Sequence, residues 1–165
     1  MSDLALLTWV ITVLGGLFLL AIWLIEYDPD FQRAAATRLP VPIISTHATL
    51  AIAGLGVWVT YLITDDDDFA YATLAILAGT LTLGITLAVR WVRVYRTSAL
   101  PKRSAVLAGA GAGGGAGGSG GAGLDVLVPP ERHFPLAVVI SHGVFAFTTV
   151  ILVLASTLGE LFHGS

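Results

Sequence analysis

Charged residues are scarce in this chain of 165 residues, where Asp, Glu, Lys and Arg make up 12% of the total. An average soluble domain carries about 25% of these residues, and here apolar residues reach 56%. Because these few ionisable side chains cannot cover a surface that faces water, a large part of the chain must face another environment. The composition therefore predicts an integral membrane protein whose main partner is the lipid bilayer.

Cysteine is absent, which excludes disulfides, iron–sulfur clusters, thiolate metal sites and cysteine nucleophiles. One Lys and seven Arg, with a net charge of −3, exclude a strong basic surface for nucleic acid. The long apolar stretches hold no carboxylate that could orient a histidine for Ser-His-Asp chemistry. The sequence therefore shows no catalytic constellation, and whether the protein is an enzyme stays open.

Four stretches without Asp, Glu, Lys or Arg are long enough to cross a hydrocarbon core, which takes roughly 20 residues of helix. They are Leu4–Ile25, Leu39–Thr64, Phe69–Val89 and Phe134–Gly159. These stretches lack the alternation of barrel strands, and an open sheet would leave backbone groups unpaired in lipid. We predict an all-α integral membrane protein, in which residues 1–165 form one bundle of four transmembrane helices.

All eight Lys and Arg residues fall on one side of this alternating path. Arg33 and Arg38 lie in the first loop, and the other six flank or occupy the third loop, whereas the Asp65–Asp68 turn and both termini have none. The positive-inside rule then places the basic loops in the cytoplasm and both termini outside, in a plasma (inner) membrane. Within the third loop, residues 108–123 are almost purely Gly and Ala, a composition typical of a flexible linker.

The second and fourth spans resemble each other when Leu39 is placed on Phe134. This alignment places Pro40 on Pro135 and His47 on His142, and each His follows a hydroxyl residue and precedes a small one. The match favours two repeated helical hairpins related by an axis along the membrane normal. The first and third spans show no comparably clear match.

Two histidines at one depth follow from this repeat. The two spans run in the same direction, and each His lies seven residues beyond its proline, about 10 Å into the membrane. Imidazoles inside a membrane are rare and indicate a functional site by default. We therefore expect His47 and His142 to face each other as metal ligands, with neighbouring hydroxyls fixing their tautomers.

Haem b suits two imidazoles better than zinc does, because the porphyrin supplies four nitrogens and the protein needs to add only two axial ligands. The flat macrocycle needs small residues beside it, and Gly84 and Gly143 are candidates for that role. Arg90, Arg93 and Arg132 stand at the cytoplasmic side, where they could pair with the propionates.

The arrangement resembles, in outline, small four-helix membrane b-type cytochromes, which bind haem through His pairs on parallel helices. The resemblance covers the helical part of the chain. The common two-haem members carry four intramembrane histidines, and two are present here, so it implies at most one bis-His haem.

Two functions remain open on this basis. The first is a haem-b electron-transfer subunit that exchanges electrons with a quinone or with another membrane or redox subunit. The second is a non-catalytic accessory or scaffold membrane protein, in which a buried His hydrogen-bonds a neighbouring helix and has only a structural role. A third possibility is that His47 and His142 form a proton-binding site or another transition-metal site.

Overall fold

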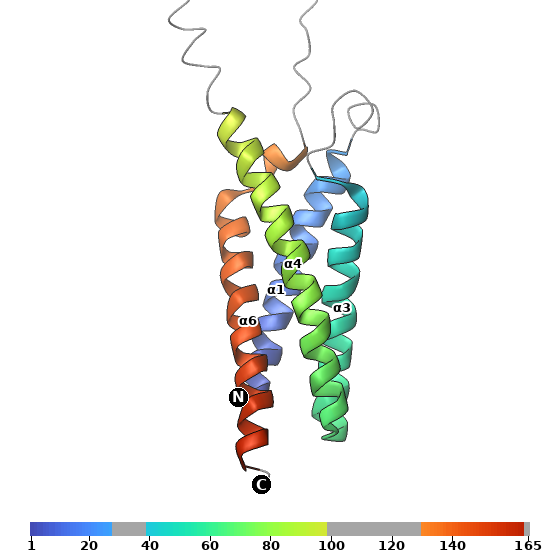
Figure 1. Cartoon of the computed structure of the whole chain (residues 1–165). Coiled ribbons are helices and arrows are strands. Elements are labelled where there is room, and N and C mark those ends of the chain that lie inside the picture. The colour runs from blue at the N-terminus through green and yellow to red at the C-terminus, as the bar shows by residue number, and fades with distance from the viewer. Residues whose placement is uncertain (28–38, 99–129, 164–165) are drawn as a thin grey trace, which may run out of the picture.

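Four long helices make up the structure, a computed structural model that describes residues 1–27, 39–98 and 130–163. They are α1 (Ser2–Ile25), α3 (Val41–Thr64), α4 (Asp67–Ser98) and α6 (Leu136–His163), with the short 3-10 helix η1 (Pro130–His133) before α6 (Figure 1). Arg33, Arg38, Lys102, Arg103 and the predicted linker 108–123 lie outside the described residues.

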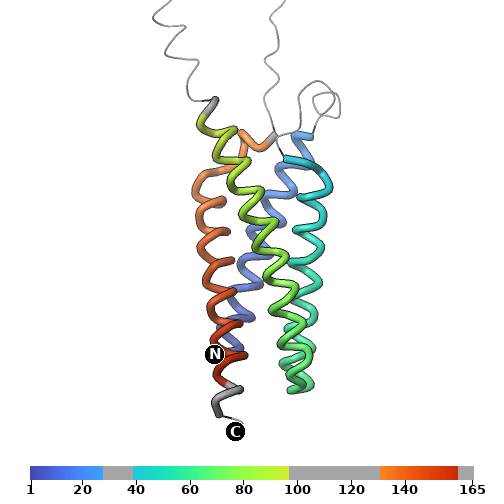
Figure 2. Tube along the Cα trace, viewed as in Figure 1, coloured from blue at the N-terminus to red at the C-terminus, as the bar shows by residue number. Residues whose placement is uncertain are grey.

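The helices lie side by side and alternate in direction, so that α1 runs parallel to α4 and α3 runs parallel to α6 (Figure 2). Helix α1 packs closely along α6, and α3 packs closely along α4. The contacts between α1 and α3 and between α4 and α6 are sparser. The molecule therefore consists of two layers, α1 with α6 and α3 with α4, and this layering leaves room for a site between them.

Prolines and aspartates define the helix ends. Pro40 is the N-cap of α3, and the carbonyl of Pro135 accepts the first backbone hydrogen bonds of α6, as expected for residues whose missing N–H costs nothing there. Asp65 ends α3 in the left-handed conformation (φ 55°), and its N–H donates to the Tyr61 carbonyl at 2.8 Å. The Asp66 carboxylate then accepts the Asp68 N–H at 3.0 Å, at the start of α4. We call this end of the bundle the Asp65 end and the opposite end the η1 end.

All four helices are long and apolar enough to cross a membrane. Their outward faces carry large apolar side chains, such as Phe18, Ile85 and Phe147, while Thr73, Thr149 and Ser156 are buried inside. So many exposed large apolar side chains match a bundle surrounded by lipid. The four predicted spans are confirmed as helices, and α4 continues beyond Val89 to Ser98.

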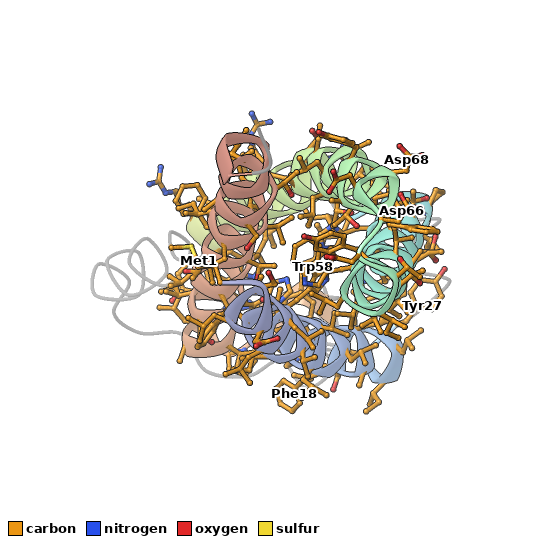
Figure 3. All side chains as sticks on the ribbon, turned by 90° about the horizontal axis from the view of Figure 1, so that it is seen from below. Met1, Phe18, Tyr27, Trp58, Asp66 and Asp68 are labelled. Atoms are coloured by element: carbon orange, nitrogen blue, oxygen red, sulfur yellow. The ribbon has the colours of Figure 1, made fainter. Side chains whose placement is uncertain are left out.

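A packed core fills the half of the bundle toward the Asp65 end. Trp58 and Val153 are fully buried in it and Trp9 is nearly so, and Trp58 points into the ring of helices (Figure 3). The indole N–H of Trp9 donates to the Ala51 carbonyl at 3.1 Å and so ties α1 to α3. The half toward the η1 end is packed less tightly, and the two histidines lie there.

Candidate functional site

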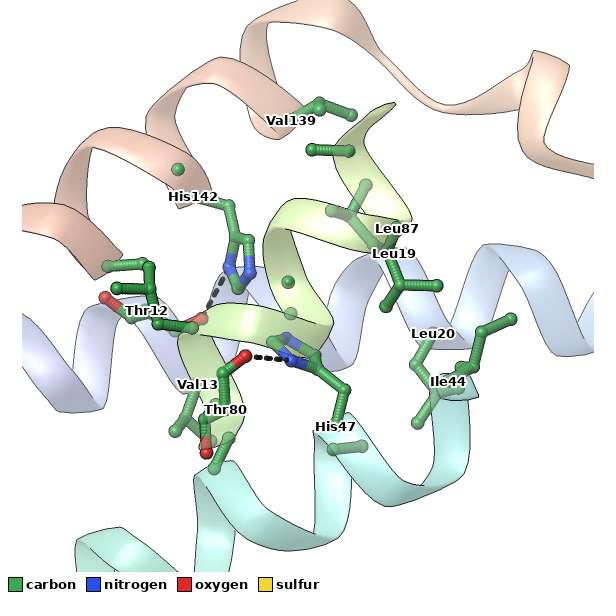
Figure 4. A pocket seen from close by; sticks show the side chains of 18 of the residues that line it. Thr12, Val13, Leu19, Leu20, Ile44, His47, Thr80, Leu87, Val139 and His142 are labelled. Carbon is green, nitrogen blue, oxygen red and sulfur yellow. Dashed lines mark hydrogen bonds between the residues drawn. The ribbon is translucent and has the colours of Figure 1, made fainter. Parts of the chain in front are cut away.

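His47 and His142 approach each other between the two layers (Figure 4). Their ring centroids are 6.5 Å apart, and their ring planes are 74° apart. Each is the seventh residue of its helix, α3 or α6, because each helix begins directly after an equivalent proline. The structure thus brings together the two residues that the repeat singled out.

Each imidazole is oriented by a backbone carbonyl of the other helix in its own layer. His47 Nδ1–H donates to the Thr80 carbonyl of α4 at 3.0 Å, and His142 Nδ1–H donates to the Thr12 carbonyl of α1 at 2.9 Å (Figure 4). A carbonyl can only accept, so the proton of each ring is on Nδ1 and the lone pair is on Nε2. Both rings therefore have the tautomer that binds a metal through Nε2.

The prediction that neighbouring hydroxyls fix these tautomers is wrong. Ser141 lies next to His142, but its hydroxyl donates to the Val138 carbonyl of its own helix. A side chain one position away points to another side of a helix and cannot reach the imidazole. Thr46, which precedes His47, is likewise on the exposed side of α3.

A glycine makes room for each imidazole. A Cβ atom on Gly84 of α4 would lie 3.0 Å from Cε1 of His47, and one on Gly16 of α1 would lie 3.0 Å from Cε1 of His142. Each glycine is one helical turn beyond the threonine whose carbonyl accepts the hydrogen bond. Each half of the site therefore consists of a His from one helix and a Thr-x-x-x-Gly segment from its layer partner.

The repeat extends to α1 and α4, which the sequence analysis missed. When Thr12 is placed on Thr80, Gly16 falls on Gly84, Trp23 on Trp91 and Tyr27 on Tyr95. Too few residues match for the sequence alone to support this alignment, but all of them belong to the site or its surroundings. The spacing Thr-x3-Gly-x6-Trp-x3-Tyr is the signal that could have identified it. The site therefore has approximate two-fold symmetry, with its axis along the bundle.

A cavity of about 450 Å³ surrounds the two imidazoles, within the range typical of cofactor sites. It extends from Trp9 and Thr149 to Trp23 and Trp91, near the η1 end. Its lining is almost entirely apolar and includes small residues from all four helices, namely Gly16, Ala48, Ala51, Gly84, Ala88, Gly143 and Ala146. The space suits a largely apolar ligand that lies between the layers.

The cavity also reaches the outer surface of the bundle on two sides. Leu17 of α1 and Ile52 of α3 line it although 42% and 50% of their surfaces are exposed. Ile85 of α4 and Phe147 of α6 line it with 55% and 60% exposed. These pairs lie where α1 meets α3 and α4 meets α6, the two sparse contacts. In a bilayer, both openings would face lipid.

The other predicted site residues divide into two groups. Gly84 and Gly143 line the cavity, and a Cβ atom on Gly143 would meet no other atom within 4 Å. Arg90, Arg93 and Arg132 lie at the η1 end but are not among the residues that line the cavity. Their pairing with propionates therefore stays a prediction.

The number of possible metal ligands limits which metal centres the site can hold. Within residues 1–27, 39–98 and 130–163, no group of three or more His, Cys, Asp or Glu side chains could hold a metal ion. Two imidazoles alone do not complete a tetrahedral zinc site. They do complete the coordination of a metal whose other four ligands come from a macrocycle.

Comparison with known proteins gives no match among protein-family models, curated proteins or solved structures. The functional argument therefore depends on the geometry of the site itself.

Proposed function

We propose that this protein is a small b-type cytochrome that binds one haem between His47 and His142 and transfers electrons within a membrane. The observation that carries the proposal is the separation of 6.5 Å between the ring centroids. Two metal–imidazole bonds of about 2.0–2.1 Å, with each ring centre about 1.1 Å behind its nitrogen, give about 6.3 Å. The two rings are thus spaced for one metal ion between them.

The surroundings of the histidines support haem in particular. Both Nδ1 atoms donate to carbonyls, so both Nε2 lone pairs are available as axial ligands. The cavity is apolar and contains small residues beside the imidazoles, as a macrocycle requires. A haem held by two imidazoles has no free coordination position, so we propose electron transfer rather than oxygen chemistry.

The lateral openings support a membrane-embedded redox partner. A macrocycle between the two layers would present its edges at the α1–α3 and α4–α6 openings, which face lipid. A quinone dissolved in the bilayer, or another membrane or redox subunit, can reach these edges without entering water. We further propose that the η1 end is cytoplasmic in the plasma membrane, because the basic residues lie in the loops at that end.

A structural role for the histidines is the second candidate, and the two hydrogen bonds favour it. His47 ties α3 to α4, and His142 ties α6 to α1, without any cofactor. Such bonds between membrane helices contribute about 0.6–2 kcal/mol each. In that case the protein is an accessory or scaffold subunit, and removing either His lowers stability only.

A reduced-minus-oxidised visible spectrum separates the two functions. Protein purified in detergent from cells supplied with a haem precursor should show the sharp band of a low-spin b-type haem. His47→Ala and His142→Ala should each abolish this low-spin spectrum, because each removes one axial ligand. With ring planes 74° apart, the ferric iron should give a strongly anisotropic low-spin EPR signal.

His133→Ala is the matched control, since His133 lies in η1 with its side chain 47% exposed. This variant should keep the wild-type spectrum. Wild-type protein without haem, purified from precursor-fed cells, would contradict the proposal and leave the structural role.

A further inference from the structure

Two tryptophans occupy equivalent places at the η1 end of the cavity. Trp23 of α1 lies seven residues beyond Gly16, and Trp91 of α4 lies seven residues beyond Gly84. Both line the cavity, with only 4% and 8% of their surfaces exposed. Each packs against the tyrosine four residues further on, with ring centroids 4.7 Å apart for Trp23 and 5.3 Å for Trp91. The two indoles thus have similar surroundings.

Their N–H groups differ, however. The Nε1–H of Trp91 donates to the Glu131 carbonyl of η1 at 3.1 Å. The Nε1 atom of Trp23 is buried, and no hydrogen-bond acceptor for it is found in the part of the chain that the structure describes. Buried indole N–H groups normally have an acceptor, because a buried donor without one loses its hydration without compensation. Trp23 therefore has a buried donor without a described acceptor, in a side chain that lines the cavity.

The position of this donor indicates which part of a ligand it would meet. Seven residues of helix separate Trp23 from Gly16, which contacts His142, so the Trp23 backbone lies about 10 Å beyond Gly16 along the bundle. This is comparable with the reach of a haem propionate from the iron. Arg90, Arg93 and Arg132 lie at the same end and favour an anion there, whereas the carboxylates of Glu26 and Glu131 at this end oppose it.

We propose that the indole N–H of Trp23 binds a propionate carboxylate of the haem and so sets which edge of the macrocycle points to the η1 end. The inference rests on the proposed function, because it concerns the same cavity. A hydrogen bond to a charged acceptor is stronger than one between neutral groups. Trp91 cannot replace Trp23, since its N–H is already bonded to Glu131.

Two porphyrins and two variants test the inference. Haem carries propionates, whereas iron etioporphyrin carries only alkyl groups, and the affinity of each is measured by titration of the haem-free protein. Trp23→Phe should weaken haem binding by about ten- to one-hundred-fold, the usual loss for a hydrogen bond to a charged group. The same substitution should change the affinity for iron etioporphyrin by less than about threefold. Trp91→Phe, the matched control, should affect both porphyrins equally.

A measurement on the wild-type protein does not depend on the folding of any variant. In the diamagnetic ferrous state, the indole N–H resonance of Trp23 should move downfield with haem but not with iron etioporphyrin. Equal weakening of both porphyrins by Trp23→Phe, or an unchanged Trp23 resonance, overturns the inference while haem binding stands. Failure of the wild-type protein to bind either porphyrin overturns the proposed function, and this inference with it.

Discussion

His47 and His142 are oriented by main-chain carbonyls, so their orientation depends on where the helices lie and not on the side chains of Thr12 and Thr80. A carbonyl whose helix is rigid holds an imidazole in one rotamer and one tautomer. In each helix this carbonyl belongs to the residue one turn before a glycine, Gly16 or Gly84. A main-chain carbonyl cannot be removed by substitution, so the orientation of the histidines is best tested by substituting these two glycines.

Gly16→Ala and Gly84→Ala should each weaken haem binding by about tenfold. The new methyl group would lie 3.0 Å from Cε1 of the facing imidazole, so the ring must move by a few tenths of an ångström from its hydrogen-bonded position. Titration with haem and the low-spin spectrum measure this effect.

Gly56→Ala is the matched control, because a Cβ atom there meets nothing within 4 Å and Gly56 is not among the residues that line the cavity. It should leave haem affinity unchanged. Unchanged affinity in Gly16→Ala and Gly84→Ala would show that the close packing beside the imidazoles has no role in binding.

Helix α3 combines two kinds of contact along its length. Toward its beginning it carries His47 at the open cavity, and further on it joins the core, where it packs closely against α4 and meets Trp9 of α1. Gly54 allows this close packing, since a Cβ atom there would lie 2.9 Å from both Ile76 and the Trp9 ring. The core thus holds the layers together at one end, and the cavity can stay open at the other.

Gly54→Ala should lower the free energy of unfolding by about 1–2 kcal/mol, because overpacking exceeds the gain in helix propensity from alanine. The change should appear as a lower unfolding midpoint in detergent, followed by circular dichroism. Gly56→Ala, two residues further along α3 in open space, should be neutral or slightly stabilising. A Gly54→Ala variant as stable as the wild type would show that Trp9 and Ile76 can move aside at no cost.

The four long helices have an approximate two-fold axis along the bundle, which relates α1 to α4 and α3 to α6 and passes between the two imidazoles. If a haem binds between the histidines, this two-fold axis would lie in the plane of the haem. Rotating the haem by 180° about the axis would exchange its two faces and leave its contacts with the protein almost unchanged. Leu17 and Ile85 are equivalent at the two edges, as are Ile52 and Phe147. If haem binds as proposed, the protein therefore has little means to distinguish the two orientations.

We expect two haem orientations of similar population in the ferric protein. Proton NMR should then show two sets of hyperfine-shifted haem methyl resonances. A reconstituted haem with a two-fold symmetric pattern of substituents should give one set, which serves as the control. A single set with native haem would mean that the small differences between the two halves suffice to select one face.

The direction of the bundle in the membrane is a separate prediction at this scale, motivated by the eight Lys and Arg residues on one side. Single cysteines at Ser2 and Ser165 should react with an impermeant thiol reagent in intact cells. A cysteine at Ser119 should react only after the cells are permeabilised. Labelling at Ser119 alone in intact cells would invert the topology.

The sequence by itself determined the four helices, because apolar stretches of membrane-spanning length leave the backbone no other way to satisfy its hydrogen bonds in lipid. It also determined that His47 and His142 share a depth, since equivalent prolines start both helices at the same distance from them. These properties depend on local composition and spacing along one chain.

Only the tertiary structure decided that the two imidazoles meet, because a rotation of α3 or α6 about its own axis leaves depth unchanged and moves the ring to another face. It also identified Thr12, Thr80 and the two cavity tryptophans as part of the site. Which carbonyl accepts a hydrogen bond, which glycine lies against an imidazole and which indole N–H stays unpaired all depend on how the helices pack together. The residue types alone do not predict them.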